Sequence, residues 1–143
     1  MIFDRLSAKS RELLVSAANE AWLLHHPSLR REHFLIALTY TGMGEIAEFL
    51  KREGLQYQPL VSETLKLNPL RVPIEIEDIP LTPDCVALLT EAGPERDALN
   101  EYVTPEDILV ALLAPDTGNI ATIIEELGVD RTGLRQKVLE RIG

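Results

Sequence analysis

The apolar positions along the chain recur with the period of an α-helix. Leu14, Ala17, Ala18 and Ala21 are spaced i, i+3, i+4 and i+7, which predicts one buried face of an amphipathic helix. Two later stretches, EHFLIALTY and EDILVALL, are apolar on nearly all sides and predict helices at the centre of the molecule. We therefore predict an all-α fold. Its shared core should include Leu35, Leu38, Leu109 and Leu112.

The two apolar stretches belong to an internal repeat. An offset of 74 residues relates Glu32 to Glu106, and upstream of them an offset of 75 relates Ser7 to Thr82. A match held over both halves, with a one-residue slip in a loop, indicates a duplication. We predict a pseudo-twofold bundle of two four-helix repeats in a single domain, residues 1–143. The first repeat should cover about 3–67, an extended connector about 68–80, and the second repeat about 81–142.

Certain residues mark where the helices begin and end. Ser7 and Thr82 are predicted N-caps of the first helix in each repeat, and Pro83 follows Thr82. Gly54 and Gly128 are predicted to close the third helix of each repeat in the left-handed conformation.

Prolines limit the helices elsewhere. Three prolines forbid a helix in the connector, and Gly93-Pro94 should end or kink the preceding helix near Ala92. The fourth helices are expected from about Pro59 to Leu67 and from about Thr132 to Ile142.

The composition excludes several classes of function. A formal net charge of −9 repels phosphate backbones, so nucleic acid is not an expected partner. The N-terminus lacks the apolar region of a signal peptide, and no apolar run approaches the roughly 20 residues of a membrane span. We therefore expect a cytoplasmic protein that does not bind membranes.

The reactive side chains do not form a catalytic or metal-binding pattern. The sequence lacks G-x-x-x-x-G-K-[ST], G-x-S-x-G and H-E-x-x-H, so we expect neither enzyme activity nor a cofactor. One cysteine and three histidines without ligand spacing predict no metal site and no disulfide framework. Cys85 is expected to be a half-buried structural residue, and His25-His26 to lie in a solvated loop.

The order of the motifs resembles that of a known family. An opening FDRLS, an Ala-rich first helix, EHFLIAL and GEIAEFLKREG, with the set given twice, is similar to the Clp amino-terminal domain, closest in register to the ClpC type. The resemblance implies a non-catalytic module that recruits adaptor proteins and protein substrates to a Clp ATPase or protease core. Such modules occur within large ATPases and as free-standing accessory proteins. The alternative is a ClpV-like recognition domain of type VI secretion, which binds a helical peptide of a sheath protein.

The same resemblance implies a binding site. In ClpC-like domains the glutamate at the position of Glu32 receives the guanidinium of phosphorylated arginine, and the phosphate meets the hydroxyl residue that opens the first helix. The implied residues are Arg5, Ser7 and Glu32 in the first repeat, and Thr82 and Glu106 in the second. Arg30 and Arg31 would add positive charge beside Glu32.

A purely structural interpretation competes with the binding site. The stretch TPED at 104–107 supplies an N-cap, a first-turn proline and two acids that complement the helix dipole, without any ligand. We favour this interpretation for Glu106. For Glu32 both interpretations stay open, and the neighbouring Arg30-Arg31 patch leads us to expect that Glu32 contributes to partner binding.

Overall fold

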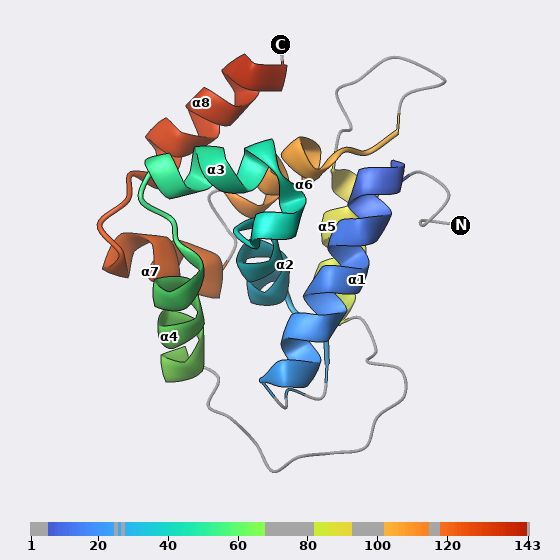
Figure 1. The fold of residues 1–143 in the computed structure, drawn as a ribbon, viewed down its shortest axis with the longest axis horizontal. Coiled ribbons are helices and arrows are strands. Elements are labelled where there is room, and N and C mark those ends of the chain that lie inside the picture. Colours follow the sequence, from blue (N-terminus) through green and yellow to red (C-terminus); the bar gives the residue numbers. More distant parts are fainter. Residues whose placement is uncertain are drawn as a thin grey trace.

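The computed structural model describes residues 6–24, 26, 28–67, 82–92, 102–114 and 118–142. These residues form eight α-helices, a 3-10 helix at Thr41–Met43, and a parallel β-bridge between Leu6 and Val103. The helices are α1 (Ala8–Leu23), α2 (Arg31–Leu38), α3 (Glu45–Arg52), α4 (Tyr57–Leu67), α5 (Pro83–Glu91), α6 (Pro105–Leu112), α7 (Asn119–Glu126) and α8 (Arg131–Ile142). The predicted all-α fold is confirmed (Figure 1).

The helices recur in the predicted order and register. α2, α3 and α4 begin 74 residues before α6, α7 and α8, and α1 begins 75 residues before α5. α5 ends at Glu91, just before Gly93-Pro94, as predicted. α4 begins at Tyr57 and α8 at Arg131, slightly earlier than predicted. The connector lies outside the described residues, so the boundaries of the repeats stay predictions.

The local signals at the helix ends act as predicted. The Ser7 hydroxyl accepts the backbone N–H of Ser10 at 3.1 Å, and the Thr82 hydroxyl accepts that of Cys85 at 3.4 Å. Both are N-caps that satisfy a donor of the first helical turn. After α3 and α7 the chain turns through Gly54 and Gly128, whose φ angles of 99° and 74° lie in the left-handed region.

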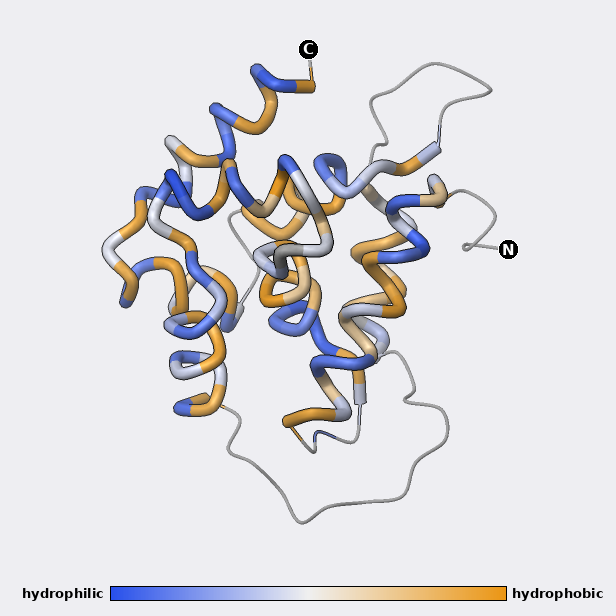
Figure 2. The backbone as a smooth tube through the Cα atoms, in the orientation of Figure 1, coloured by the Kyte–Doolittle hydropathy of each residue, from blue (hydrophilic) through white to orange (hydrophobic). Residues whose placement is uncertain are grey.

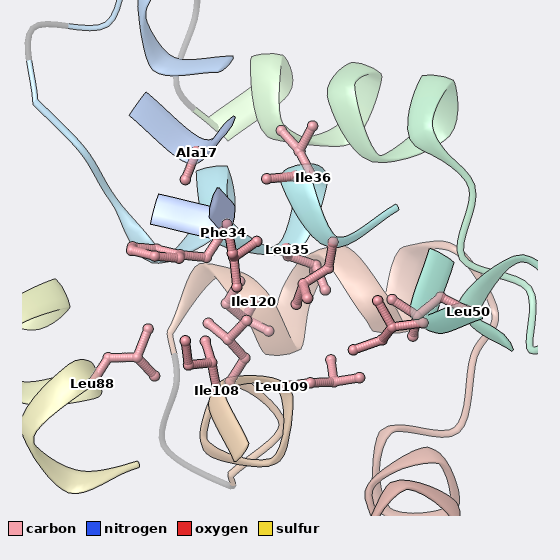
Figure 3. Close-up of a cluster of buried hydrophobic side chains, with 14 of the residues drawn as sticks. Ala17, Phe34, Leu35, Ile36, Leu50, Leu88, Ile108, Leu109 and Ile120 are labelled. Carbon is pink, nitrogen blue, oxygen red and sulfur yellow. The ribbon is translucent and has the colours of Figure 1, made fainter. Parts of the chain in front are cut away.

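α2 and α6 form the centre of the bundle, and the remaining helices surround them (Figure 1). Both are hydrophobic over most of their length (Figure 2). Leu35 from the first repeat and Leu109 from the second point into one apolar cluster (Figure 3). The four predicted core leucines are fully buried: Leu35, Leu38, Leu109 and Leu112. The two repeats therefore share one core.

The buried face of α1 is rotated slightly from its predicted centre. Leu13, Ala17 and Ala21 are fully buried, whereas Leu14 and Ala18 are partly buried at the edge of the core. The apolar spacing identified the helix and its inward side, but the small side chains left the centre of that side undetermined. None of the described helices combines the length and apolarity needed to cross a membrane.

Candidate functional site

The beginning of α1 is attached to the loop that precedes α6. The Val103 carbonyl accepts the backbone N–H of Ser7 at 2.9 Å and the hydroxyl of Ser10 at 2.6 Å. Leu6 and Val103 pair as a parallel bridge at the same place. These bonds hold Ser7, from the first repeat, beside the chain that leads into Glu106, from the second repeat.

The beginning of α5 is attached to the first repeat in the same way. The Leu29 carbonyl accepts the backbone N–H of Thr82 at 3.1 Å, and the Cys85 thiol lies 3.1 Å from the same oxygen. Leu29 and Val103 are 74 residues apart, so the two attachments are equivalent. Cys85 is fully buried in this contact, and the prediction of a half-buried thiol was wrong.

The two attachments cross the repeats. Ser7 lies beside the loop of Glu106, and Thr82 lies beside the loop of Glu32. The sequence-based grouping, which placed Ser7 with Glu32 and Thr82 with Glu106, is therefore exchanged in the structure. Ser7 precedes α1 and the loop that leads to Glu32 follows it, and α1 itself is about 24 Å long, at 1.5 Å for each of its 16 residues. Arg5 lies outside the described residues.

Glu106 opens onto a polar hollow of about 450 Å³. We call it the Glu106 hollow; its lining residues are Glu45, Thr104, Glu106, Arg141 and Ile142. The first turns of α3 and α6 bring the two glutamates, and the last turn of α8 brings Arg141. The Arg141 guanidinium lies over the Phe49 ring, 4.6 Å from its centroid, which fixes a positive charge at this place.

The N-terminus of α6 is closed by Thr104, its N-cap, together with Asp107. The Thr104 hydroxyl accepts the Asp107 N–H at 3.2 Å, and the Asp107 carboxylate accepts the Thr104 N–H at 2.9 Å. This reciprocal pair is a capping box. Glu106 takes no part in the box, so its half-buried side chain serves the helix only through the dipole.

In the first repeat His33 takes the place of Asp107, accepting the backbone N–H of the residue before the helix. His33 Nδ1 accepts the Arg30 N–H at 2.9 Å, and His33 Nε2 lies 2.8 Å from His26 Nδ1. Because Nδ1 is an acceptor, the proton of neutral His33 is on Nε2 and points to His26. Burial, then the neighbouring His26, then Arg30 lower the pKa of His33 to about 3.

This pair corrects the interpretation of the histidines. His26 is only 4% exposed, so the prediction of a solvated loop was wrong for it, while His25 lies outside the described residues. The sequence held a signal for the cap of α2, since the offset of 74 aligns His33 with Asp107. Both side chains accept the N–H of the residue three positions before them.

The side chain of Glu32 is more deeply buried than that of Glu106. The Glu32 side chain lies in the first turn of α2 and is only 5% exposed. Arg30 is exposed, and Arg31 is half-buried with an Nε that has no hydrogen-bond partner among the described residues. Within the same residues, no group of three histidine, cysteine or acidic side chains is arranged to hold a metal ion.

Comparison with known proteins identifies the family of the chain. Residues 5–100 match the Clp repeat (R) N-terminal domain. The chain belongs to this family. It is 29% identical over 143 residues to the chloroplastic chaperone protein ClpC of Pisum sativum, which covers 99% of this chain and 16% of that protein. The chain spans about a sixth of the length of the curated relatives it matches.

Solved Clp N-domains have the same fold. The N-terminal domain of the caseinolytic protease associated chaperone ClpD from Arabidopsis thaliana superposes with a TM-score of 0.81, at 17% identity and 99% coverage of both chains. The N-domain in a complex of ClpV with a VipB peptide gives a TM-score of 0.65, at 21% identity, over 94% of this chain and 84% of that one. The resemblance to the Clp amino-terminal domain is confirmed.

Proposed function

We propose that this chain is a non-catalytic module that recruits adaptor proteins or protein substrates to a Clp ATPase and its protease. The match of residues 5–100 to the Clp repeat family carries the proposal. The chain matches only about a sixth of the length of its relatives. Its role in proteolysis is therefore proposed from the family alone.

The Glu106 hollow is the part of the surface best suited to a phosphoarginine side chain. Two carboxylates, those of Glu106 and Glu45, line it and can accept the planar guanidinium. Arg141 lines the same hollow and can pair with the phosphate. The ligand would thus meet opposite charges at its two ends, and Ser7 lies on the neighbouring helix start.

Accessibility favours Glu106 over Glu32. A guanidinium must reach the carboxylate from solvent, and the 5% exposed Glu32 offers little surface for that approach. We therefore assign ligand binding chiefly to Glu106, although the sequence pattern led us to expect it at Glu32. Arg30 and Arg31 retain the role of an anion-attracting patch beside Thr82.

Calorimetric titration with a phosphoarginine peptide and its unphosphorylated counterpart tests the proposal. Glu106→Ala and Arg141→Ala should each weaken binding of the phosphorylated peptide by about tenfold, the loss of one charge-assisted contact, while melting temperatures change little. Glu32→Ala should weaken binding less than Glu106→Ala does. Glu125→Ala, on the exposed face of α7, is the matched control and should bind like the wild type.

Two results would refute the assignment. Equal affinity for both peptides would exclude recognition of the phosphate. Unchanged binding by Glu106→Ala and Arg141→Ala would exclude the Glu106 hollow, leaving recruitment to be tested with adaptor proteins.

A second candidate function is the docking of a helical peptide on α1. Val15 and Trp22, seven residues apart on that helix, are 70% and 54% exposed. Trp22 is the one tryptophan of the chain, so its fluorescence reports any peptide that covers this face. A blue shift on titration with an amphipathic helical peptide, lost in Val15→Glu, would favour this candidate over phosphoarginine binding.

A further inference from the structure

The C-termini of the two central helices, α2 and α6, differ in the side chains that donate to their last carbonyls. At the end of α6, Arg131 from α8 donates a hydrogen bond to the Leu113 carbonyl, and Arg135 donates to the Val110 carbonyl at 3.4 Å. The last carbonyls of a helix carry partial negative charge and lack partners within the helix. Two guanidinium groups of the second repeat supply both the bonds and the opposite charge.

The first repeat has no such arginines. The offset of 74 places Tyr57 where the second repeat has Arg131, and Val61 where it has Arg135. The Tyr57 hydroxyl donates instead to the Glu20 carboxylate at 2.7 Å, which directs the side chain to α1. Burial, and then this bond, raise the pKa of Tyr57 to about 12. α4 therefore brings no cation to the end of α2, whose own last turn has none.

A hollow of about 230 Å³ lies at this end of α2. We call it the Thr39 hollow, because Thr39 is the counterpart of Leu113, the residue that accepts Arg131. Within the described part of the chain, no hydrogen bond to the Thr39 carbonyl is formed. A molecule of liquid water occupies about 30 Å³. The hollow therefore has room for several waters, or for one long side chain in their place.

The lining of the Thr39 hollow combines apolar surface with a carboxylate and the end of α2, a combination that an arginine side chain can use. The half-buried Tyr57 ring offers apolar surface for an aliphatic stem, and the buried Leu55 lies beneath the hollow. Glu48 and the end of α2 supply negative charge at its polar side. Lys51 lines the same hollow and opposes a cation, but neither it nor Glu48 forms an ion pair within the described residues.

We propose that the Thr39 hollow binds an arginine side chain presented by a partner protein. The guanidinium would donate to the Thr39 carbonyl at the end of α2, as Arg131 donates to the Leu113 carbonyl at the end of α6. The second repeat thus shows the same contact made within the chain. This site is separate from the Glu106 hollow, and the two share no lining residue.

Titration of the ¹⁵N-labelled chain with N-acetyl-arginine amide tests the proposal. Saturable shifts should be confined to the amides around Thr39, Glu48 and Leu55. N-acetyl-citrulline amide is the neutral isostere and should bind about tenfold more weakly, because it lacks the charge. Equal binding of citrulline, or tighter binding of N-acetyl-norleucine amide, would overturn the assignment to arginine.

Charge variants on the rim locate the binding. Lys51→Glu should tighten binding of the arginine amide about threefold, and Glu48→Lys should weaken it by a similar factor, as for exposed charges. The matched control is Glu125→Lys, at the counterpart of Lys51 in the second repeat, where Arg131 already meets the helix end. A control that changes affinity as much as Glu48→Lys would overturn the location.

Arg131→Ala provides an independent test, because it removes the hydrogen bond to the Leu113 carbonyl at the end of α6. This variant opens the end of α6, and the arginine amide should raise its melting temperature more than that of the wild type. An equal increase in both proteins would contradict the equivalence of the two helix ends.

Discussion

Thr64 buries its side-chain hydroxyl in the bundle. The residue is 1% exposed, and its Oγ1 has no partner among the described residues. The second repeat has Val138 at the equivalent position, also buried. Burial of an unpaired hydroxyl costs free energy that the isosteric valine avoids.

Thr64→Val should therefore stabilise the protein by about 1 kcal/mol, measured by urea denaturation. The reverse change, Val138→Thr, should destabilise it by about the same amount or more. A destabilised Thr64→Val would show that the hydroxyl has a partner in solution.

His33 makes the stability of the protein depend on pH. Its folded pKa of about 3 lies below the ordinary value of 6.5, because burial, His26 and Arg30 disfavour its charged form. Between these two pH values the unfolded chain holds a proton that the folded chain has released. The contribution of neutral His33 is therefore complete above about pH 6.5 and declines as the pH falls towards 3.

Lowering the pH from 7 to 5 should cost the wild type about 2 kcal/mol through His33 alone. His33→Asn does not titrate, so its unfolding free energy should fall less over the same interval. Urea denaturation of both proteins at the two pH values measures the difference. Parallel pH dependence of the two proteins would mean that His33 is charged in the folded state.

Among the elements, the starts of α1 and α5 hold the repeats together. Each helix presents two donors to one carbonyl of the opposite repeat, from Ser7 and Ser10 to Val103 and from Thr82 and Cys85 to Leu29. A hydroxyl is a stronger donor than a thiol, so the attachment of α1 should contribute more than that of α5.

Ser10→Ala should destabilise the protein by about 1–2 kcal/mol, because it removes a buried hydrogen bond at 2.6 Å to Val103. Ser16→Ala on the same helix has the same effect on helix propensity and should change stability little. Equal effects of the two variants on urea unfolding would show that the bond contributes nothing net.

The helices were predictable because their signals are local. The N-caps Ser7 and Thr82 and the closing Gly54 each act on the helical turn beside them. The centre of the α1 face was not predictable, because leucines and alanines of similar polarity surround it. The burial of His26 was not predictable either, because it depends on contact with His33, a partner that the helical period does not identify.

In the whole molecule, α2 and α6 pack against each other, and the buried side chains of both repeats form one cluster within the described residues. This arrangement decides which residues meet at the candidate site. The resemblance supplied Ser7, Glu32, Thr82 and Glu106, but the sequence could not show that their pairing crosses the repeats. Nor could it place Glu45 and Arg141, which α3 and α8 bring to Glu106 through tertiary packing alone.

The crossed pairing of Ser7 with Glu106 is tested most directly by a double-mutant cycle on binding of the phosphoarginine peptide. Ser7→Ala and Glu106→Ala should be non-additive by about 0.5 kcal/mol or more, because Ser7 is bonded to Val103 in the loop that leads into Glu106. Ser7→Ala and Glu32→Ala should be additive within about 0.3 kcal/mol, because they belong to separate sites. Coupling of Ser7 to Glu32, with none to Glu106, would contradict the crossed arrangement.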